Sequence, residues 1–263
     1  MEFYTLASGS SGNAALVREH NTVLLIDAGV SERRIAQELA SVGIALSELS
    51  AILVTHEHVD HIKGLQTLCK KCTAPVYASR GTAQSLFYAG DALRMFESGE
   101  TFTVGAFEVR SFPSSHDAAD PVGYRIDCES GSLGFLTDTG FVTDDAYQTL
   151  LGVDLLLLEA NHDIETLQSG PYPRFLKSRI LGRHGHLSNA QAAEFALQSV
   201  KAGTGDIMLA HLSSENNTPV MAEYAVARKL QQHGYSVRLC TAPRDTISEV
   251  HLCKKSPSFA LEN

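Results

Sequence analysis

The stretch Val54-Thr55-His56-Glu57-His58-Val59-Asp60-His61 has the form HxHxDH and follows an apolar run that begins at Ala51. We expect residues 51–55 to form a strand that leads directly into this loop. A loop at a strand end can present the imidazoles of His56 and His58 to one cation, while Asp60 and His61 face a second position nearby. The pattern therefore predicts a metal site at the end of a strand.

Two cations need more donors than one loop supplies, and three candidates follow other predicted strands. His116 comes after residues 107–112, Asp138 after residues 133–137, and His211 after residues 207–210. A single Asp or His at a strand end more often forms a turn or a hydrogen bond. Together with HxHxDH, however, the three complete a set of nitrogen and carboxylate donors without thiolate, which suits Zn, Mn, Fe or Ni. We therefore predict two divalent metal ions.

The wider chain alternates between two kinds of hydrophobic pattern. Short apolar, β-branched runs predict strands at residues 22–26, 51–55, 107–112, 122–126, 133–137, 154–158, 207–210 and 236–239. A helical period predicts helices at residues 32–42, 61–72, 82–89, 189–200 and 219–233. This alternation is typical of an α/β protein with helices on the sheet faces. No linker or repeat interrupts it, so we expect a single domain over residues 1–263, with a loose tail after about residue 251.

Composition limits the partners and the compartment. Lys plus Arg number 21 and Asp plus Glu number 30, so the net charge is −9 and any contact with nucleic acid must be local. The five cysteines are scattered, which favours a reducing compartment. Cys69 and Cys72 form a lone CxxC in a predicted helix, a weak indication of metal or redox use. No signal peptide or membrane-spanning run is visible, so we expect a cytoplasmic protein that does not associate with a membrane.

One local basic region stands out on this acidic chain. Residues 166–193 contain no Asp or Glu, but Tyr172 and Phe175 lie there among the basic residues Arg174, Lys177, Arg179 and Arg183. Basic and aromatic side chains together are expected in a groove that follows a nucleic-acid backbone. The alternative is a helix whose solvated face is merely basic.

A Gly/Ser-rich turn at residues 8–13 is a second candidate for phosphate contact. Its backbone N–H groups, with Ser10 and Asn13, could surround a phosphate. Turn formation alone explains the same composition.

These residues resemble the metallo-β-lactamase superfamily. Seven of them match its metal motifs in order, namely His56, His58, Asp60, His61, His116, Asp138 and His211. Asp27, in Ile26-Asp27-Ala28-Gly29, matches the first Asp of the superfamily, which supports the ligands from behind. The resemblance implies an αββα sandwich with a dinuclear site at one sheet edge. It implies that His56, His58 and His116 hold one metal, that Asp60, His61 and His211 hold the other, and that Asp138 bridges them.

Narrower stretches resemble the YycJ/WalJ branch, bacterial nucleases described as 5′-to-3′ DNA exonucleases. They are residues 6–13, 116–124, 159–163, 185–189 and 211–217. Glu159 and His186 are also similar to paired motifs of tRNA 3′-processing nucleases, in which a Glu orients a His that protonates the leaving oxygen. DNA is therefore the expected partner; protein partners are not predicted.

The resulting hypothesis is metal-assisted phosphodiester hydrolysis. Asp60 or Asp138 would orient the attacking water, and His186, held by Glu159, would act as general acid. Alternatively, His186 merely precedes a helix capped by Ser188 or Asn189. His162 either lines the site or packs beside it.

Other functions share this scaffold. A thioesterase or lactonase would use the same metals without needing the basic region or His186. An RNA 3′-processing-type endonuclease is a second alternative. An iron redox protein and a non-catalytic DNA-binding subunit are the remaining alternatives.

Overall fold

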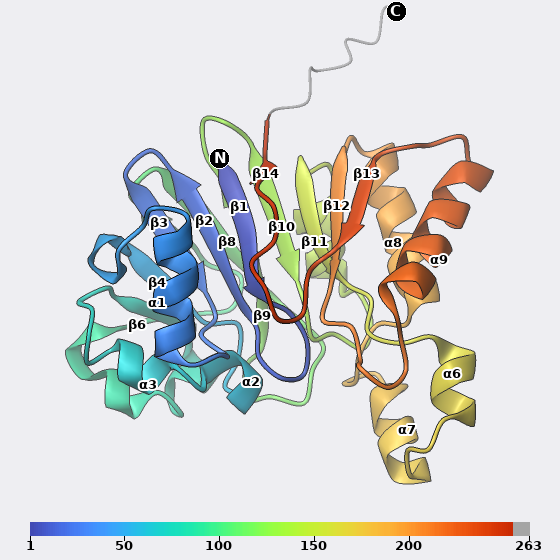
Figure 1. Ribbon diagram of the computed structural model, residues 1–263, viewed down its shortest axis with the longest axis horizontal. Helices are drawn as coiled ribbons and strands as arrows, with labels where there is room; N and C mark the ends of the chain where they lie inside the picture. Colours follow the sequence, from blue (N-terminus) through green and yellow to red (C-terminus); the bar gives the residue numbers. More distant parts are fainter. Residues whose placement is uncertain (255–263) are drawn as a thin grey trace, which may run out of the picture.

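Two seven-stranded sheets face each other in the computed structural model, which describes residues 1–254 (Figure 1). The first sheet has the order β14 (His251–Leu252), β1 (Glu2–Ala7), β2 (Ala14–Glu19), β3 (Thr22–Ile26), β4 (Ala51–Leu53), β5 (Val76–Ser79) and β6 (Leu93–Phe96). The second has the order β13 (Arg238–Thr241), β12 (Asp206–Ala210), β11 (Leu155–Glu159), β10 (Ser132–Leu136), β9 (Val122–Asp127), β8 (Phe107–Pro113) and β7 (Thr101–Val104).

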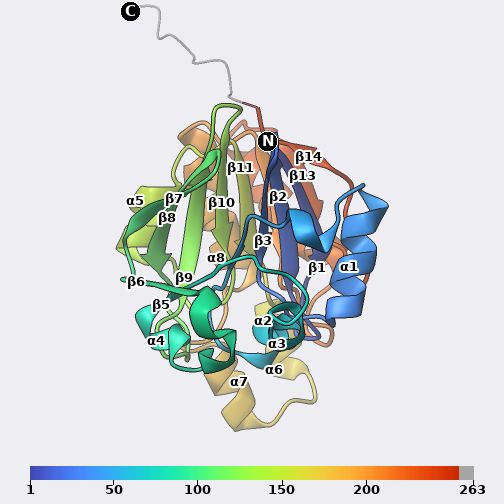
Figure 2. The ribbon, with the colours of Figure 1, turned by 90° about the vertical axis from the view of Figure 1, so that its left-hand side faces the viewer.

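Helices cover the outer face of each sheet, as the two views show (Figures 1 and 2). The first sheet packs against α1 (Glu32–Ser41), α3 (Leu65–Leu68) and α4 (Arg80–Ala83). The second packs against α5 (Asp144–Leu150), α8 (Asn189–Lys201) and α9 (Pro219–Gln232). The short helices α2 (Val59–Ile62), α6 (Ile164–Ser169) and α7 (Arg174–Ile180) lie at the lower end in Figure 1.

The hydrophobic core between the sheets draws on both of them. Phe3 and Leu24 of the first sheet and Phe107, Tyr124 and Leu157 of the second are almost fully buried in one cluster. Side chains alternate between the two faces of a strand, so each sheet buries one face here and the other beneath its helices. The αββα sandwich predicted from the sequence is confirmed.

Two predicted helices are wrong in their bounds. The helix expected at residues 61–72 is divided into α2 and α3 because the N–H of Gly64 donates to the carbonyl of Ala28, at 2.7 Å, instead of to the carbonyl four residues earlier. The approach is so close that a Cβ on Gly64 would lie 2.1 Å from the carbonyl oxygen of Val30. The helix expected at residues 82–89 is α4 followed by a 3₁₀ helix, Phe87–Ala92, which is interrupted by Gly90 at φ 51°. A second 3₁₀ helix spans Leu46–Glu48.

Three further predictions concern the C-terminal end, the CxxC pair and the membrane. A loose tail was predicted after about residue 251, but β14 begins at His251 and pairs with β1. The rest of that predicted tail, residues 255–263, lies outside the described residues. Cys69 and Cys72 are partly buried against the core of the first sheet, and neither belongs to a metal-binding group within residues 1–254. No helix in that range has both the length and the hydrophobicity needed to cross a membrane.

The strand ends that carry the predicted site meet at one edge. β3 and β4 run parallel, as do β10, β11 and β12, and their following loops lie beside α2 and α7 (Figure 1). The lower edge in Figure 1 is therefore where the candidate ligands from distant parts of the chain come together.

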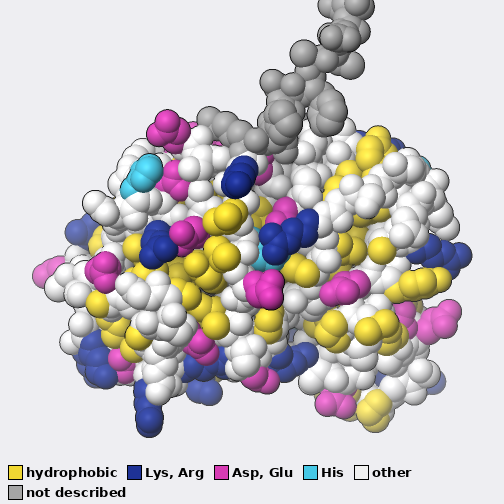
Figure 3. Space-filling model, turned by 45° about the horizontal axis from the view of Figure 1, so that its top comes forward, with side chains coloured by type: hydrophobic (Ala, Val, Ile, Leu, Met, Phe, Trp, Pro, Cys, Tyr) yellow, Lys and Arg dark blue, Asp and Glu magenta, His cyan; other side chains and the backbone are white. Residues whose placement is uncertain are grey.

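Figure 3 brings the upper side of the molecule forward. On that face Lys and Arg side chains are interspersed with Asp and Glu and do not gather in one patch.

Candidate metal centre

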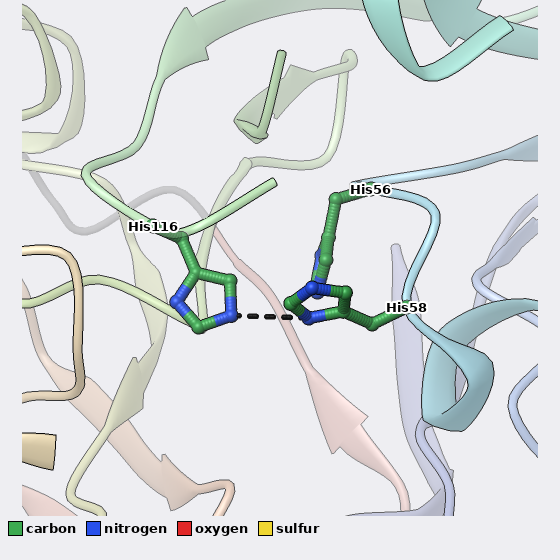
Figure 4. A group of neighbouring side chains, drawn as sticks. All are labelled: His56, His58 and His116. Carbon is green, nitrogen blue, oxygen red and sulfur yellow. Dashed lines mark hydrogen bonds between the residues drawn. The ribbon is translucent and has the colours of Figure 1, made fainter. Parts of the chain in front are cut away.

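Three imidazoles form the first group of candidate ligands (Figure 4). His56 and His58 come from the loop between β4 and α2, and His116 follows β8. One nitrogen from each lies within 4.8 Å of the others, and His58 Nδ1 is 3.2 Å from His116 Nε2. Three converging ring nitrogens are an arrangement that suits a divalent cation.

A second group adjoins the first. Asp60, His61 and His211 bring ligand atoms within 4.8 Å of one another, and Asp138 lies within the same limit of His56 and His61. Asp138 Oδ2 is 3.2 Å from His61 Nε2. The structure therefore brings all seven predicted ligands together, with Asp138 beside both groups.

Asp27 stands behind this cluster. Its carboxylate accepts hydrogen bonds from the backbone N–H and the hydroxyl of Thr55 and from Nδ1 of His61, each at 2.8 Å. These contacts tie the end of β3 to the histidine loop after β4. The remaining nitrogen of His61, Nε2, faces the candidate site, as a metal ligand requires.

Backbone strain gathers at the site. Asp27, Asp138 and His211 have φ values of 60°, 54° and 56°, and each lies just beyond a strand end. Among residues 1–254, His20 is the only other non-glycine residue with positive φ. This conformation costs about 1 kcal/mol or more for a residue with a Cβ. Its concentration here is typical of a functional site.

The protonation states indicate a site that attracts cations. Burial lowers the pKa of His56 and of His116, which favours the neutral imidazole that binds metals. Burial alone would raise the pKa of Asp138, but His211 and His61 hold it well below its usual range. Burial opposes protonation of His211, yet Asp138, Asp60 and Glu159 raise its pKa to about 10. In the absence of metal, a proton on His211 thus partly neutralises the buried carboxylates, a role that bound divalent cations would take over.

Unsatisfied atoms supply a further test of fit. Within the described residues, His56 Nε2, His211 Nε2 and Asp138 Oδ2 are buried and make no hydrogen bond. Buried polar atoms are rarely left without a partner. A donor set of imidazole and carboxylate groups therefore fits divalent metal ions at this position.

Glu159, the last residue of β11, links His186 to this centre. One of its oxygens accepts from His186 Nδ1 at 2.8 Å and from His211 Nδ1 at 2.9 Å, and the other accepts from the backbone of Thr139 and Leu187. Burial opposes its ionisation, but His186 and His211 lower the pKa of Glu159 to about 2. The contact with His211 was missed by the sequence analysis.

His186 lies two residues before Ser188, which is the N-cap of α8. The position at a helix entry and the contact with Glu159 therefore coexist, so capping does not explain His186 by itself.

A pocket of about 240 Å³ opens onto the cluster. Besides several ligand candidates it is lined by Ser10, Asp117, Tyr172, Arg179 and His186. Arg179 Nε donates to Asp117 Oδ2 at 2.7 Å.

The other residues proposed for substrate contact do not line the pocket. Asn13 braces its own turn through Gly9 and lies 3.1 Å from His61 Nε2. Lys177 Nζ donates to two backbone carbonyls, those of Gln168 and Gly170. Arg183 lies over the ring of Phe141, and Arg174 is exposed, outside the pocket lining.

Two acidic residues went unnoticed in the sequence. Glu57, inside HxHxDH, accepts from Ala119 N at 2.7 Å and from the Thr82 hydroxyl at 3.2 Å, which ties the histidine loop to the loop after His116. Asp117 ties that second loop to α7. Their only sequence signal is adjacency to a predicted ligand.

His162 is fully buried, does not line the pocket, and has no hydrogen bond to either ring nitrogen within the described residues. Burial lowers its pKa to about 4. The structure thus places it behind the site.

Comparison with known proteins identifies the family. The model of the Beta-lactamase superfamily domain matches residues 22–212. The chain is 38% identical over 242 residues to exodeoxyribonuclease YycJ of Bacillus anthracis, covering 90% of this chain and 92% of that protein. It is 40% identical over 238 residues to exodeoxyribonuclease WalJ of Streptococcus pneumoniae, covering 88% of each. The chain belongs to the YycJ/WalJ branch of the metallo-β-lactamase superfamily.

Solved structures agree with the fold. The metallo-β-lactamase fold protein YhfI from Bacillus subtilis superposes with a TM-score of 0.71 at 17% identity, and the match covers 95% of this chain and 100% of that chain. Human tRNase Z, short form, gives a TM-score of 0.67 at 17% identity, covering 95% and 99%. At such low identity these likenesses support the fold alone.

Proposed function

We propose that this protein is a metal-dependent 5′-to-3′ DNA exonuclease that uses two divalent metal ions. The relatives named exodeoxyribonucleases support this activity, since they share about two-fifths of the residues over nearly the whole chain. The observation that carries the proposal is that Glu159 holds His186 at the edge of the same pocket that the His and Asp cluster encloses. A small-molecule hydrolase would not need that pair.

The metals would be divided between the two groups of ligands. His56, His58 and His116 would hold one ion, Asp60, His61 and His211 the other, and Asp138 would contact both. When bound, such ions activate water and neutralise charge on phosphoryl oxygens. Zn, Mn, Fe and Ni all suit these donors.

The protein itself would supply positioning and proton transfer. Asp27 fixes His61, and Asp60 or Asp138 would orient the attacking water. Glu159 accepts from Nδ1 of His186, which leaves Nε2 to deliver a proton to the departing sugar oxygen. Arg179 would bind a phosphate at the mouth of the pocket.

End-labelled DNA tests this function. Wild-type protein loaded with Mn²⁺ or Zn²⁺ is incubated with single- and double-stranded oligonucleotides labelled at either end, and product lengths are followed with time. We expect stepwise shortening from the 5′ end. His58→Ala should lower metal affinity by more than about 100-fold and abolish degradation, whereas His233→Ala, an exposed residue at the end of α9, should change neither.

Three results would contradict the proposal. Internal cleavage of intact circles would exclude an exonuclease, and preferential degradation of RNA would exclude DNA as the substrate. Hydrolysis of S-lactoylglutathione without any nuclease activity would favour the thioesterase alternative.

A further inference from the structure

At the mouth of the pocket the positively charged side chain of Arg179 is paired with the carboxylate of Asp117. Among the described residues that line it, Arg179 is the one Lys or Arg, whereas Asp60, Asp117 and Asp138 are acidic. A DNA strand is a polyanion, so how Arg179 is presented bears directly on binding.

The pairing uses only one edge of the guanidinium. Arg179 Nε donates to Asp117 Oδ2 at 2.7 Å, and within residues 1–254 no hydrogen bond or ion pair engages Nη1 or Nη2 of Arg179. Two parallel N–H groups are the donors that Arg uses for bidentate contact with phosphate. The contact with Asp117 therefore leaves the phosphate-binding edge free.

Asp117 lies between the candidate metal centre and α7. It follows His116 directly, and its other oxygen lies 3.4 Å from His116 Nε2. It belongs to none of the candidate ligand groups in the described residues. Arg179 is carried by α7 and its side chain is 58% exposed, so the hydrogen bond to Asp117 orients its guanidinium relative to the site.

We propose that Asp117 is a positioning residue that orients Arg179 as a clamp for a backbone phosphate of the DNA strand next to the scissile bond. This inference rests on the proposed nuclease function and names the residue that aligns its substrate. It makes a prediction opposite in sign to simple charge repulsion, because removing an acid from the pocket should weaken the binding of DNA.

Binding and kinetics of Asp117→Asn, Arg179→Gln and the double variant test this inference. Kd is measured by fluorescence anisotropy with a 5′-phosphorylated, phosphorothioate-linked single strand, and kcat and KM with the ordinary strand, all on metal-loaded protein. We expect each single variant to raise Kd and KM by roughly 10-fold, with a smaller change in kcat. The double variant should match Arg179→Gln alone, because Asp117 acts through Arg179.

A similar pair elsewhere provides the control. Arg80 Nε also pairs with a surface carboxylate, Glu97, and the Arg80 side chain is 62% exposed, but it lies outside the pocket. Arg80→Gln and Glu97→Gln should leave Kd unchanged.

Other outcomes overturn the inference. A lower Kd for Asp117→Asn would make Asp117 a competitor of phosphate, additive effects would make the two residues independent, and loss of bound metal would make Asp117 a ligand. Wild-type protein that binds the strand but hydrolyses neither DNA nor bis(p-nitrophenyl) phosphate would overturn the nuclease function instead, and the Kd comparison would still judge the clamp.

Discussion

In the proposed mechanism His186 is the general acid, and the choice of leaving group isolates this role. We expect His186→Ala to lower turnover of DNA by roughly 10²- to 10⁴-fold without changing metal content. A p-nitrophenyl ester of thymidine 5′-phosphate should lose much less, because its leaving group departs without a proton. Steady-state rates and elemental analysis check this, with His233→Ala as control. Equal losses of rate on both substrates would show that His186 does not act by donating a proton to the leaving group.

His162 predicts an acid-sensitive stability. Because burial lowers its folded pKa to about 4 from the ordinary value of 6.5, the unfolded chain binds more protons between these values. Stability from this residue is therefore fully present above about pH 6.5 and is lost as the pH falls towards 4, by roughly 3 kcal/mol in all.

Chemical unfolding of metal-free protein measures this effect. The free energy of unfolding of wild type should fall more between pH 6.5 and 4 than that of His162→Leu. An identical fall in the two proteins would show that His162 does not titrate in this way, and His233→Leu should behave as wild type.

The residues that could be predicted from the sequence are those whose side chains follow a strand in a recognisable pattern. HxHxDH and the three strand-end residues carry chemistry that few other contexts demand. Asp117 and the contact between Glu159 and His211 could not be predicted, because they depend on how α7 and β12 approach the loops in three dimensions.

At the scale of elements, regular periodicity was a good guide only where packing left it undisturbed. α1 and α9 differ from the predicted helices by one residue at their C-terminal ends. The prediction of one helix at residues 61–72 was wrong because the tertiary contact of Gly64 with the loop after β3 overrides local helix propensity. The elements that were not predicted lack a long apolar pattern; they are β1, β2, β5, β6, β7, β14, α5, α6 and α7. The strand predicted at residues 236–239 lies two residues further along the chain, as β13.

The predicted basic region turned out to have divided roles. Its Lys177 fastens α7 to the preceding turn through two hydrogen bonds of 2.7 Å, so its ammonium group is engaged within the protein. We expect Lys177→Met to speed backbone hydrogen exchange at residues 174–180, because the short helix loses both of these hydrogen bonds. Exchange followed by mass spectrometry measures this.

The neighbouring Arg174 is the control for that prediction. It is exposed on the same helix. Arg174→Gln should leave exchange unchanged; equal rates in wild type and Lys177→Met would show that α7 is held by other contacts.

At the scale of the whole molecule, the candidate metal centre joins the two sheets. Its ligands follow β4 in one sheet and β8, β10 and β12 in the other. A metal present at about 1,000 times its Kd stabilises the folded state by about 4 kcal/mol. At roughly 2 °C per kcal/mol for a chain of this size, chelation should lower Tm by roughly 8 °C for each ion removed.

Calorimetry with and without a chelator checks this value. His58→Ala should show a smaller difference between the two conditions, because it has lost one ligand. A wild-type Tm that is the same in both conditions would mean that no metal is bound in the folded state.

The left-handed backbone at Asp27, Asp138 and His211 has a consequence for how this sequence can change. Glycine would relieve the strain at each position, but at Asp27 it would also remove the hydrogen bonds that hold Thr55 and His61, and at His211 the one to Glu159. Asp138 differs, because its Oδ2 is buried and makes no hydrogen bond within the described residues. A library ranked only by survival of heating in metal-free buffer should therefore accumulate inactive members at Asp138.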